Sequence, residues 1–311
     1  MIRASIVIPV YNGERTIARA LDSAMAQRCD GECEVIVVDD GSSDATPQIL
    51  ETYGARLRVL TQENRGPAAA RNAGAALARG EYLAFLDADD AFLPNKMAVT
   101  VPVLDRVPAA VLVFHDAIPV DASGRETARS YVTPAMAWAP TMADLLERWW
   151  PILPSTAVMR RKTFEACGGF VEEFRSAAYE DPYLFLLARE HGEFQYVPER
   201  LTYYTIEPPA IRMEKYVRAQ EVFIRRVRER YGASARGLIR NTRHAYASAL
   251  GYQGLLAMCA GEVEAARGYF VRALRHQPNL RTALRLMRTY LPARIARALS
   301  GRTAQGPNLT A

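Results

Sequence analysis

Three aspartates, Asp87, Asp89 and Asp90, follow an apolar run at residues 82–86. Two carboxylates on a tight turn after a buried strand suit Mg²⁺ or Mn²⁺, which protein sites often bind through one or two carboxylates plus phosphate oxygens. Acidic turns are also common at strand ends, where an Asx-turn closes the strand or caps a helix. Taken alone, the Asp-x-Asp pattern leaves metal binding and simple turn formation equally open.

A second acidic cluster, Asp39-Asp40, ends another apolar run and is followed by Gly-Ser-Ser-Asp at residues 41–44. The serines and the last aspartate are typical helix caps, but Asp39 and Asp40 are more carboxylates than capping requires. A carboxylate there can accept a hydrogen bond from a nucleobase N–H or a ribose hydroxyl. Arg71 lies one turn into a predicted helix at 67–78, where it suits either a phosphate group or a salt bridge to a nearby aspartate.

The elements that must position these side chains alternate along the chain. Apolar runs predict strands at residues 5–10, 34–38, 57–60 and 82–86, and helical spacing predicts helices at 16–27, 46–53 and 67–78. This alternation is typical of an α/β fold with a mostly parallel sheet flanked by helices. Ligands of such sheets bind beyond the carboxyl ends of the strands, which is where Tyr11-Asn12 and the two acidic clusters fall.

Four segments in this order carry a family resemblance: residues 5–12 (SIVIPVYN), 37–44 (VVDDGSSD), 64–74 (NRGPAAARNAG) and 85–90 (FLDADD). They resemble the ordered blocks of family 2 inverting glycosyltransferases with the GT-A fold, over roughly the first third of the chain. The resemblance implies a metal-dependent, hexosyl-type transferase that uses Mg²⁺ or Mn²⁺ and a nucleotide-diphosphate sugar. It assigns Asp89 to the metal and a further set to the nucleotide: Pro9, Tyr11, Asn12, Asp39, Asp40, Arg71 and Asp87, with Arg71 near the diphosphate and Asp87 on the ribose or metal.

The family also places a catalytic carboxylate at the start of a helix on the acceptor side, and Glu180-Asp181 before Pro182 fits that pattern. An inverting transfer needs one base to take the proton of the acceptor hydroxyl, and Asp181 is the residue we expect to do so, with Glu180 beside it. The alternative is that Asp181 only caps the helix. Trp150 is expected on the acceptor wall and Trp149 in the core.

Two departures from the family pattern bear on the site and on the product. Many relatives have a metal-side His downstream of the base, but the corresponding stretch at 203–209 has none, so Glu207 is the substitute that the sequence offers. The chain also lacks a Gln-x-x-Arg-Trp block and a membrane span, which argues against a processive polymer synthase.

Charge divides the chain. Residues 1–211 hold 20 Lys and Arg against 29 Asp and Glu, a net of −9, whereas residues 212–311 hold 19 against 5, a net of +14. We therefore expect a GT-A domain at 1–211, with a nucleotide-binding half at 1–90 and an acceptor half at 91–211. A basic, all-helical region follows at 212–311. Within it, residues 246–275 resemble one tetratricopeptide-type helix pair.

The last helical stretch, residues 280–299, is amphipathic and basic, and it is equally compatible with a solvated terminal helix and with a peripheral membrane contact. The positive charge lacks a supporting nucleic-acid motif, so no nucleic-acid partner is expected. The chain starts directly with a strand-like run rather than a leader, which predicts a cytoplasmic protein, at most peripheral on the inner face of the membrane.

The predicted function is transfer of a single sugar from a nucleotide-diphosphate donor to an acceptor hydroxyl on a glycan or lipid-linked acceptor, in cell-envelope or exopolysaccharide synthesis. The alternative is a catalytically silent protein that keeps the nucleotide-sugar fold and uses its helical tail for interactions. The missing metal-side His favours this alternative, and the presence of Asp89 and Asp181 argues against it.

Overall fold

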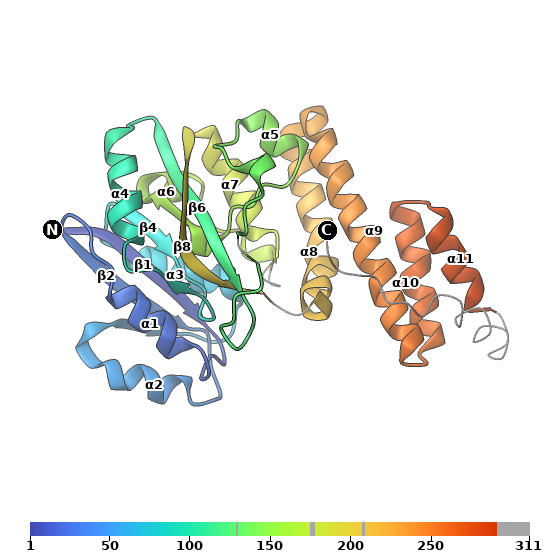
Figure 1. Cartoon of the computed structure of the whole chain (residues 1–311), viewed down its shortest axis with the longest axis horizontal. Helices are drawn as coiled ribbons and strands as arrows, with labels where there is room; N and C mark the ends of the chain where they lie inside the picture. The colour runs from blue at the N-terminus through green and yellow to red at the C-terminus, as the bar shows by residue number, and fades with distance from the viewer. Residues whose placement is uncertain (129, 175–177, 207–208, 291–311) are drawn as a thin grey trace. The chain divides into compact units, whose positions relative to one another are not determined.

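The computed structural model describes residues 1–128, 130–174, 178–206 and 209–290. The chain forms two compact units (Figure 1): Met1–Pro208 with Arg218–Ile239, and Pro209–Val217 with Arg240–Ala311. The expected domain boundary at residue 211 falls inside helix α8 (Pro209–Tyr231), and the division into domains there stays a prediction.

The described residues of the first unit form an eight-stranded sheet of order β3-β2-β1-β4-β7-β6-β8-β5. The pairs β3–β2, β2–β1 and β1–β4 are parallel, and β6 is parallel to β8. Strand β7 is antiparallel to β4 and β6, and β5 is antiparallel to β8. The predicted mixed, mostly parallel sheet is confirmed. The strands are β1 (Ile2–Val10), β2 (Glu32–Asp39), β3 (Arg58–Thr61), β4 (Tyr82–Phe85), β5 (Ala91–Phe92), β6 (Ala110–Val120), β7 (Ala157–Arg160) and β8 (Glu193–Thr205).

Helices cover both faces of this sheet, which explains why its central strands are apolar without alternation. Side chains point to opposite faces in turn along a strand, so Ile6 and Ile8 of β1 pack in one core cluster with helices α1 and α4. Val7 faces the other way, toward Gly74 of α3, where a Cβ would lie 2.4 Å from its Cγ1. The helices of this part are α1 (Ile17–Met25), α2 (Thr46–Tyr53), α3 (Pro67–Leu77), α4 (Lys96–Arg106), α5 (Met142–Glu147), α6 (Arg161–Ala166) and α7 (Glu180–Glu190).

A buried carboxylate, Glu34, ties the amino ends of three elements together. Its Oε1 accepts hydrogen bonds from Ser5 Oγ (2.6 Å) and the Arg79 backbone N–H (2.7 Å), and its Oε2 lies 3.0 Å from Arg58 Nη1 and 2.8 Å from Arg79 Nη2. Burial raises the pKa of Glu34, but the bonds from Ser5, Arg79 and Arg58 outweigh burial and lower this pKa from 4.5 to about 2.

We expect Glu34→Gln to lower the free energy of unfolding at pH 7 by up to about 3.5 kcal/mol, since each unit of pKa shift is worth about 1.4 kcal/mol. The folded-state pKa is depressed, so this stability is fully present above pH 4.5 and is lost as the pH falls toward 2. Urea unfolding of wild type and Glu34→Gln at pH 7 and pH 3 measures it. The exposed Glu32 on the same strand is the control, and an equal effect of Glu32→Gln contradicts the assignment.

The segment Arg218–Ile239 belongs to the first unit and contains the end of α8, the turn Gly232–Ala235 and the start of α9 (Arg236–Cys259). The ring of Phe223 stacks on Trp149, with centroids 5.1 Å apart and an interplanar angle of 27°. Arg226 forms an ion pair with Glu173 (2.7 Å), and Arg230 forms one with Glu190 at the end of α7 (2.6 Å). These contacts attach the carboxyl-terminal part of α8 to the sheet-bearing unit.

The second unit is helical in its described part, as predicted. It contains the rest of α8 and of α9 (Arg236–Cys259), together with α10 (Val263–His276) and α11 (Leu280–Arg288). Phe270 of α10 packs on Ala257 and against Gly254 of α9, where a Cβ would lie 2.6 Å from the ring. The likeness of this helix pair to a tetratricopeptide unit stays a prediction. Among the described residues, none of the helices combines the length and the apolar character that crossing a bilayer requires.

Candidate functional site

The sheet order places the predicted nucleotide-binding segments side by side. Strands β2, β1 and β4 are adjacent and parallel, so Asp39, Tyr11-Asn12 and the turn Asp87–Asp90 all follow the carboxyl ends of neighbouring strands. The register pairs Val10 with Asp39. The expected convergence of these segments at one sheet edge is therefore what the structure has.

Asn12 joins the loops after β1 and β2. Its backbone adopts a left-handed conformation (φ 52°), which asparagine tolerates better than most residues. Its N–H donates to Ser42 Oγ (2.9 Å), and its Oδ1 accepts from the Ser43 N–H (2.8 Å). The neighbouring Tyr11 is 53% exposed and presents an aromatic ring at this edge, whereas Pro9 is buried within β1. Of the three, Tyr11 is the side chain best placed to stack on a base.

The paired aspartates after β2 have different tasks. Asp40 uses both carboxylate oxygens inside the protein: it accepts hydrogen bonds from Gln62 Nε2 (2.7 Å), the Arg65 N–H (2.9 Å) and the Gly66 N–H (2.8 Å). It thereby holds the loop that leads into α3. Asp39 uses Oδ1 to accept from the Ser42 N–H (2.9 Å). Asp39 is thus the better candidate for nucleotide binding, and the predicted contact of Asp40 has no support from its bonding.

The turn after β4 divides its three aspartates between surface and interior. The Asp90 N–H donates to the Asp87 carbonyl (3.0 Å), and the buried Asp90 Oδ1 accepts from the Thr205 N–H (2.8 Å). Burial raises the pKa of Asp90 well above its usual value, and Asp89 and Asp87 raise it further. The carboxylates of Asp87 and Asp89, both half-buried, are the ones within reach of solvent.

These two carboxylates fit a divalent cation in the donor set that they offer. Among the described residues there is no group of three or more His, Cys, Asp or Glu that could hold a metal unaided. Mg²⁺ at nucleotide sites is held by one or two carboxylates and by the phosphates of the ligand, so such a group is not required. Asp89, with Asp87 beside it, would hold the ion. Glu207, considered above as a further ligand, lies outside the described residues.

Arg71 joins the donor side to the predicted base. Its buried guanidinium donates from Nη2 to Asp87 Oδ1 (2.6 Å) and from Nη1 to Glu180 Oε1 (3.0 Å). Burial lowers the pKa of Arg71, but Asp87 and Glu180 outweigh it and raise the pKa overall. Arg71 therefore forms the salt bridge that the sequence offered as an alternative. A contact between Arg71 and a diphosphate stays a prediction.

Asp181 is the second residue of α7, and the charged groups that act on its carboxyl are Glu180, Arg71 and Asp87. Burial raises its pKa well above the usual value and the adjacent Glu180 raises it further, while Arg71 lowers it. The capping position is Tyr179, which makes no side-chain capping bond, so the structure does not use Asp181 as the helix cap. A carboxyl with a raised pKa is better matched to proton transfer near neutral pH.

Tyr179, just before the acidic pair, has a strained backbone. Its φ of 71° lies in the left-handed region, which a bulky residue adopts at a cost of order 1–3 kcal/mol. Its ring lies against Trp149 and Phe223, with centroid distances of 5.0 Å to each. This aromatic cluster holds the turn that presents Glu180 and Asp181.

Trp138 and Trp150 differ in how far they are exposed. Trp150 is 7% exposed and donates from Nε1 to the Trp138 carbonyl (3.3 Å). Trp138 is 41% exposed and packs edge-on against Trp150. The exposed ring is thus Trp138, with Trp150 supporting it, and any contact of either ring with an acceptor stays a prediction.

Three residues that the sequence did not single out form hydrogen bonds with the backbone of the turn Asp87–Asp90. Ser155 Oγ accepts from the Asp87 N–H (3.1 Å), and Thr205 Oγ1 and Arg19 both donate to the Asp89 carbonyl. Of the three, only Thr205 could have been suspected from sequence, because it lies in the 203–209 stretch where relatives have the metal-side His. Arg19 lies in α1 and Ser155 in the 3₁₀ helix Pro154–Thr156, and the approach of both to this turn is set by tertiary packing.

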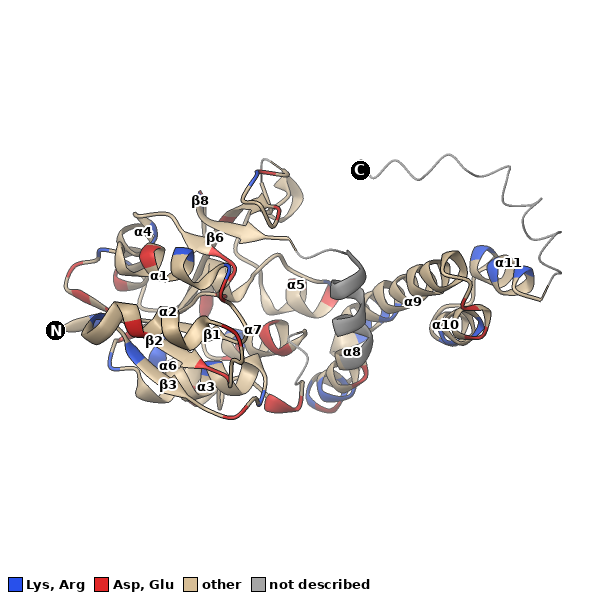
Figure 2. Cartoon of the chain, turned by 90° about the horizontal axis from the view of Figure 1, so that it is seen from below, with Lys and Arg blue, Asp and Glu red and all other residues tan. Residues whose placement is uncertain are grey.

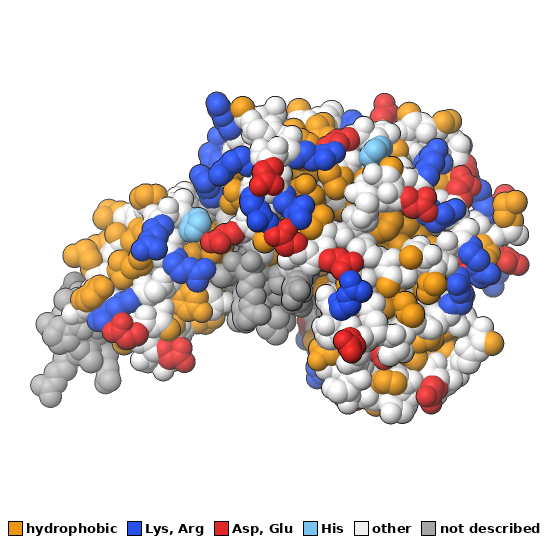
Figure 3. All heavy atoms as spheres, turned by 180° about the vertical axis from the view of Figure 1, so that it is seen from behind, with side chains coloured by type: hydrophobic (Ala, Val, Ile, Leu, Met, Phe, Trp, Pro, Cys, Tyr) orange, Lys and Arg blue, Asp and Glu red, His pale blue; other side chains and the backbone are white. Residues whose placement is uncertain are grey.

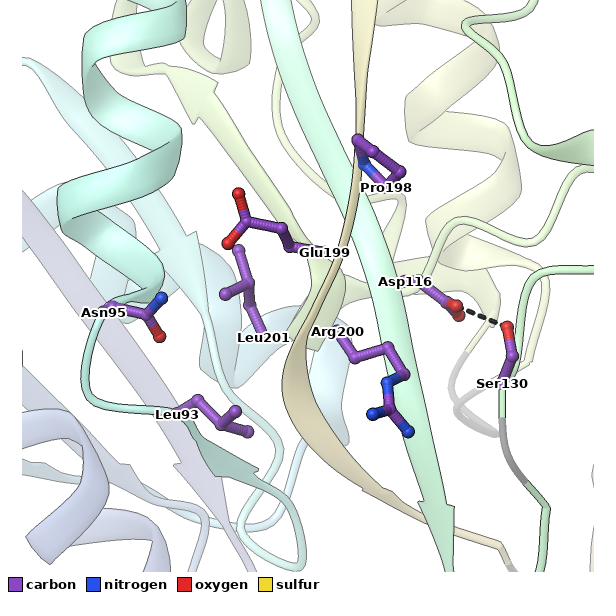
Figure 4. Close-up of a pocket in the computed structure, with 8 residues that line it drawn as sticks. All are labelled: Leu93, Asn95, Asp116, Ser130, Pro198, Glu199, Arg200 and Leu201. Carbon is purple, nitrogen blue, oxygen red and sulfur yellow. Dashed lines mark hydrogen bonds between the residues drawn. The ribbon is translucent and has the colours of Figure 1, made fainter.

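A separate cleft of about 490 Å³ opens beside β8 (Figure 4). It forms where Val197 and Arg200 pair with consecutive residues of β6, so that Pro198-Glu199 bulge out. Asp116 lines it and accepts hydrogen bonds from Ser130 Oγ and from the Tyr131 and Val132 N–H groups. None of the predicted site residues is in its lining: Leu93, Asn95, Asp116, Ser130, Pro198, Glu199, Arg200 and Leu201.

Solved structures with the same fold include two bound to nucleotide sugars. Residues 1–349 of *S. aureus* TarS, solved with UDP-GlcNAc, match with a TM-score of 0.55 and 20% identity over 97% of this chain and 92% of that one. The mannosyltransferase PcManGT of *Pyrobaculum calidifontis*, solved with GDP-Man and Mn²⁺, matches with a TM-score of 0.55 and 19% identity over 92% of this chain and 87% of that one. At these identities the likeness shows the fold, and the predicted GT-A architecture is confirmed.

Sequence comparison finds relatives over part of the chain. The succinoglycan biosynthesis protein ExoO of *Rhizobium meliloti* is 40% identical over 111 residues, which are 35% of this chain and 32% of that protein. The match also spans about a third of the first curated relatives, uncharacterized glycosyltransferases of *Rickettsia* at 41% identity. The model of glycosyl transferase family 2 matches residues 5–168, more than half of the chain. With the sheet edge described above, this match shows that the chain belongs to glycosyl transferase family 2.

Proposed function

We propose that this protein is a metal-dependent, inverting, hexosyl-type glycosyltransferase that moves a single sugar from a nucleotide-diphosphate sugar to an acceptor hydroxyl. The observation that carries the proposal is the link through Arg71, which joins Asp87 at the donor edge to Glu180 beside Asp181. A donor site and a base with a raised pKa are thereby held within one buried ion network.

On the donor side, Tyr11, Asn12 and Asp39 would contact the nucleoside and Asp87 the ribose. The support is their common sheet edge and the nucleotide sugars present in TarS and PcManGT. When bound at Asp89, Mg²⁺ or Mn²⁺ would neutralise charge on the diphosphate that departs. PcManGT was solved with Mn²⁺, which supports this choice of ion.

On the acceptor side, Asp181 takes the proton of the attacking hydroxyl. The hydroxyl oxygen forms a bond to the anomeric carbon as the bond from that carbon to the diphosphate oxygen breaks, which inverts the configuration. Glu180 and Arg71 position this carboxyl and do not exchange protons with the acceptor. The acceptor would be a glycan or lipid-linked sugar of the cell envelope or an exopolysaccharide, as the name of ExoO supports.

The donor half of the proposal is tested by thermal unfolding with UDP, GDP, dTDP and CMP, each with and without Mn²⁺. A ligand at about 100 times its dissociation constant stabilises the folded state by about 2.7 kcal/mol, which corresponds to a rise in Tm of about 5 to 10 °C. We expect one diphosphate to give this rise only with Mn²⁺. Asp89→Asn should abolish the dependence on Mn²⁺, because it removes the predicted metal carboxylate.

The matched control is Asp30→Asn, the same chemical change at an exposed aspartate outside the site. Stabilisation by a diphosphate that is unchanged in Asp89→Asn contradicts the metal assignment, and no stabilisation by any of the four nucleotides contradicts the donor site. Binding without nucleoside diphosphate release from the matching sugar donor supports the catalytically silent alternative.

A further inference from the structure

Helix α11 carries three side-chain series with the same i, i+4, i+7 spacing, displaced from one another by one residue. The first series, Leu280, Leu284 and Met287, is apolar and exposed, at 75%, 49% and 64%. An exposed apolar row on one helix face is unusual for a helix that is otherwise packed.

The second series faces the protein. Thr282 and Thr289 are each 6% exposed, and Leu286 packs in the cluster formed by Ala257, Ala266 and Phe270. Asn279 caps the helix by accepting a hydrogen bond from the Thr282 N–H (2.8 Å). The helix is therefore anchored by one face, and the apolar row does not serve its packing on α10.

The third series, Arg281, Arg285 and Arg288, is offset by one residue from the apolar row and is basic. Figure 2 shows the basic positions of α11 in blue. Burial lowers the pKa of Arg285, and the like charges of Arg281 and Arg288 lower it further. From residue 265 to the end, the sequence has nine Arg and no Asp or Glu. Apolar and basic side chains lie next to one another on the molecular surface that Figure 3 shows.

We propose that this face of α11, the apolar row Leu280, Leu284 and Met287 with the basic row Arg281, Arg285 and Arg288, binds an anionic lipid surface. An interfacial helix buries apolar side chains at the headgroup boundary and keeps basic side chains level with the anionic headgroups. The apolar row provides side chains to bury at the headgroup boundary, and the basic row next to it provides the positive charge. The proposal commits to lipid because the charge of this segment is of one sign, which suits a surface of many anionic groups. Of the stretch predicted above at 280–299, residues 291–299 lie outside the described part.

The test is co-sedimentation of the full chain with vesicles of phosphatidylcholine alone and with vesicles containing about one third phosphatidylglycerol. We expect binding to the anionic vesicles and weak binding to phosphatidylcholine. Arg281→Gln with Arg288→Gln should weaken binding about 20- to 30-fold, since each basic residue near such a surface contributes roughly fivefold. Leu284→Ser with Met287→Ser should weaken it by at least about tenfold.

The matched control is Arg228→Gln with Arg243→Gln, which removes the same charge from exposed positions on α8 and α9 and should leave vesicle binding within about twofold of wild type. Thermal unfolding of each variant checks that the helices stay folded. Equal loss in the control pair overturns the proposal in favour of non-specific charge attraction. Absence of vesicle binding, with a concentration-dependent oligomer that Leu284→Ser and Met287→Ser dissolve, overturns it in favour of a second copy on this face. Neither outcome depends on the proposed sugar transfer.

Discussion

Replacing Asp181 by asparagine is expected to lower kcat for sugar transfer by about 10²- to 10⁴-fold, the contribution that a positioned general base typically makes. The amide has nearly the shape of the carboxylate but cannot take the proton of the acceptor hydroxyl. Because the nucleotide contacts predicted for Tyr11, Asp39 and Asp89 are untouched, KM for the donor should stay near the wild-type value. Release of nucleoside diphosphate from the donor identified by thermal unfolding, with and without acceptor, measures both constants.

The pH dependence of kcat provides an independent check of this base. A base works only when deprotonated, so activity is lost as the pH falls through the pKa of Asp181. Burial and Glu180 raise that pKa, hence the loss should occur at a clearly higher pH than the value of about 3.9 for a free aspartate. The residual activity of Asp181→Asn should lack this acidic limb. Asp30→Asn is the control and should keep the wild-type kcat. If Asp181→Asn also keeps the wild-type kcat, another residue takes the proton.

The second large effect is expected at Arg71. Arg71→Met leaves Glu180, 3% exposed, as a buried carboxylate without its cation, and breaking a buried pair in this way typically costs 3–5 kcal/mol. For a unit of this size the loss corresponds to a fall in Tm of about 10 °C. Sugar transfer should also fall, because Asp87 and the start of α7 lose their common partner.

A double variant separates the charge effect from lost packing. Arg71→Met combined with Glu180→Gln removes the stranded charge and should recover at least about half of the lost stability, a coupling that a double-mutant cycle measures. Arg65→Met is the matched control: Arg65 pairs with Glu172 at the surface, where an ion pair is worth about 1 kcal/mol or less. Equal losses for Arg65→Met and Arg71→Met, or no recovery in the double variant, contradict the network.

The nucleotide-binding half could be predicted from sequence because its signals are local. Each strand is a continuous apolar run, and parallel strands joined by helices must end at the same edge, so the order of the chain alone brings Asn12, Asp39 and Asp87 together. Sequence could not separate Asp39 from Asp40, since their difference depends on the loop at 62–66, whose donors reach Asp40. Strand β8 was missed because Pro198, Glu199 and Arg200 interrupt its apolar pattern.

The link across the site could not be predicted from sequence. Arg71 and Glu180 are 109 residues apart, and the sequence favours a phosphate for an arginine at that helix position, with a salt bridge to a nearby aspartate as the alternative. Its pairing with Glu180 depends on the position of α7. The strain at Tyr179 has no sequence signal either, because tyrosine rarely adopts a positive φ and does so here under the packing of Trp149 and Phe223. Such features depend on tertiary contacts between distant segments.

The chain leaves the sheet-bearing unit at Pro208 and returns to it from Arg218 to Ile239. This return has a consequence for how such proteins can exchange parts during evolution. Recombination at residue 211 would keep every donor-side aspartate but would replace Phe223, and with it the ring that backs Tyr179 next to Glu180 and Asp181. Recombination after Ile239 would keep Phe223 and the turn before Asp181. Ile239 lies inside the continuous helix α9, so a new carboxyl-terminal region would have to continue that helix without a change of its register.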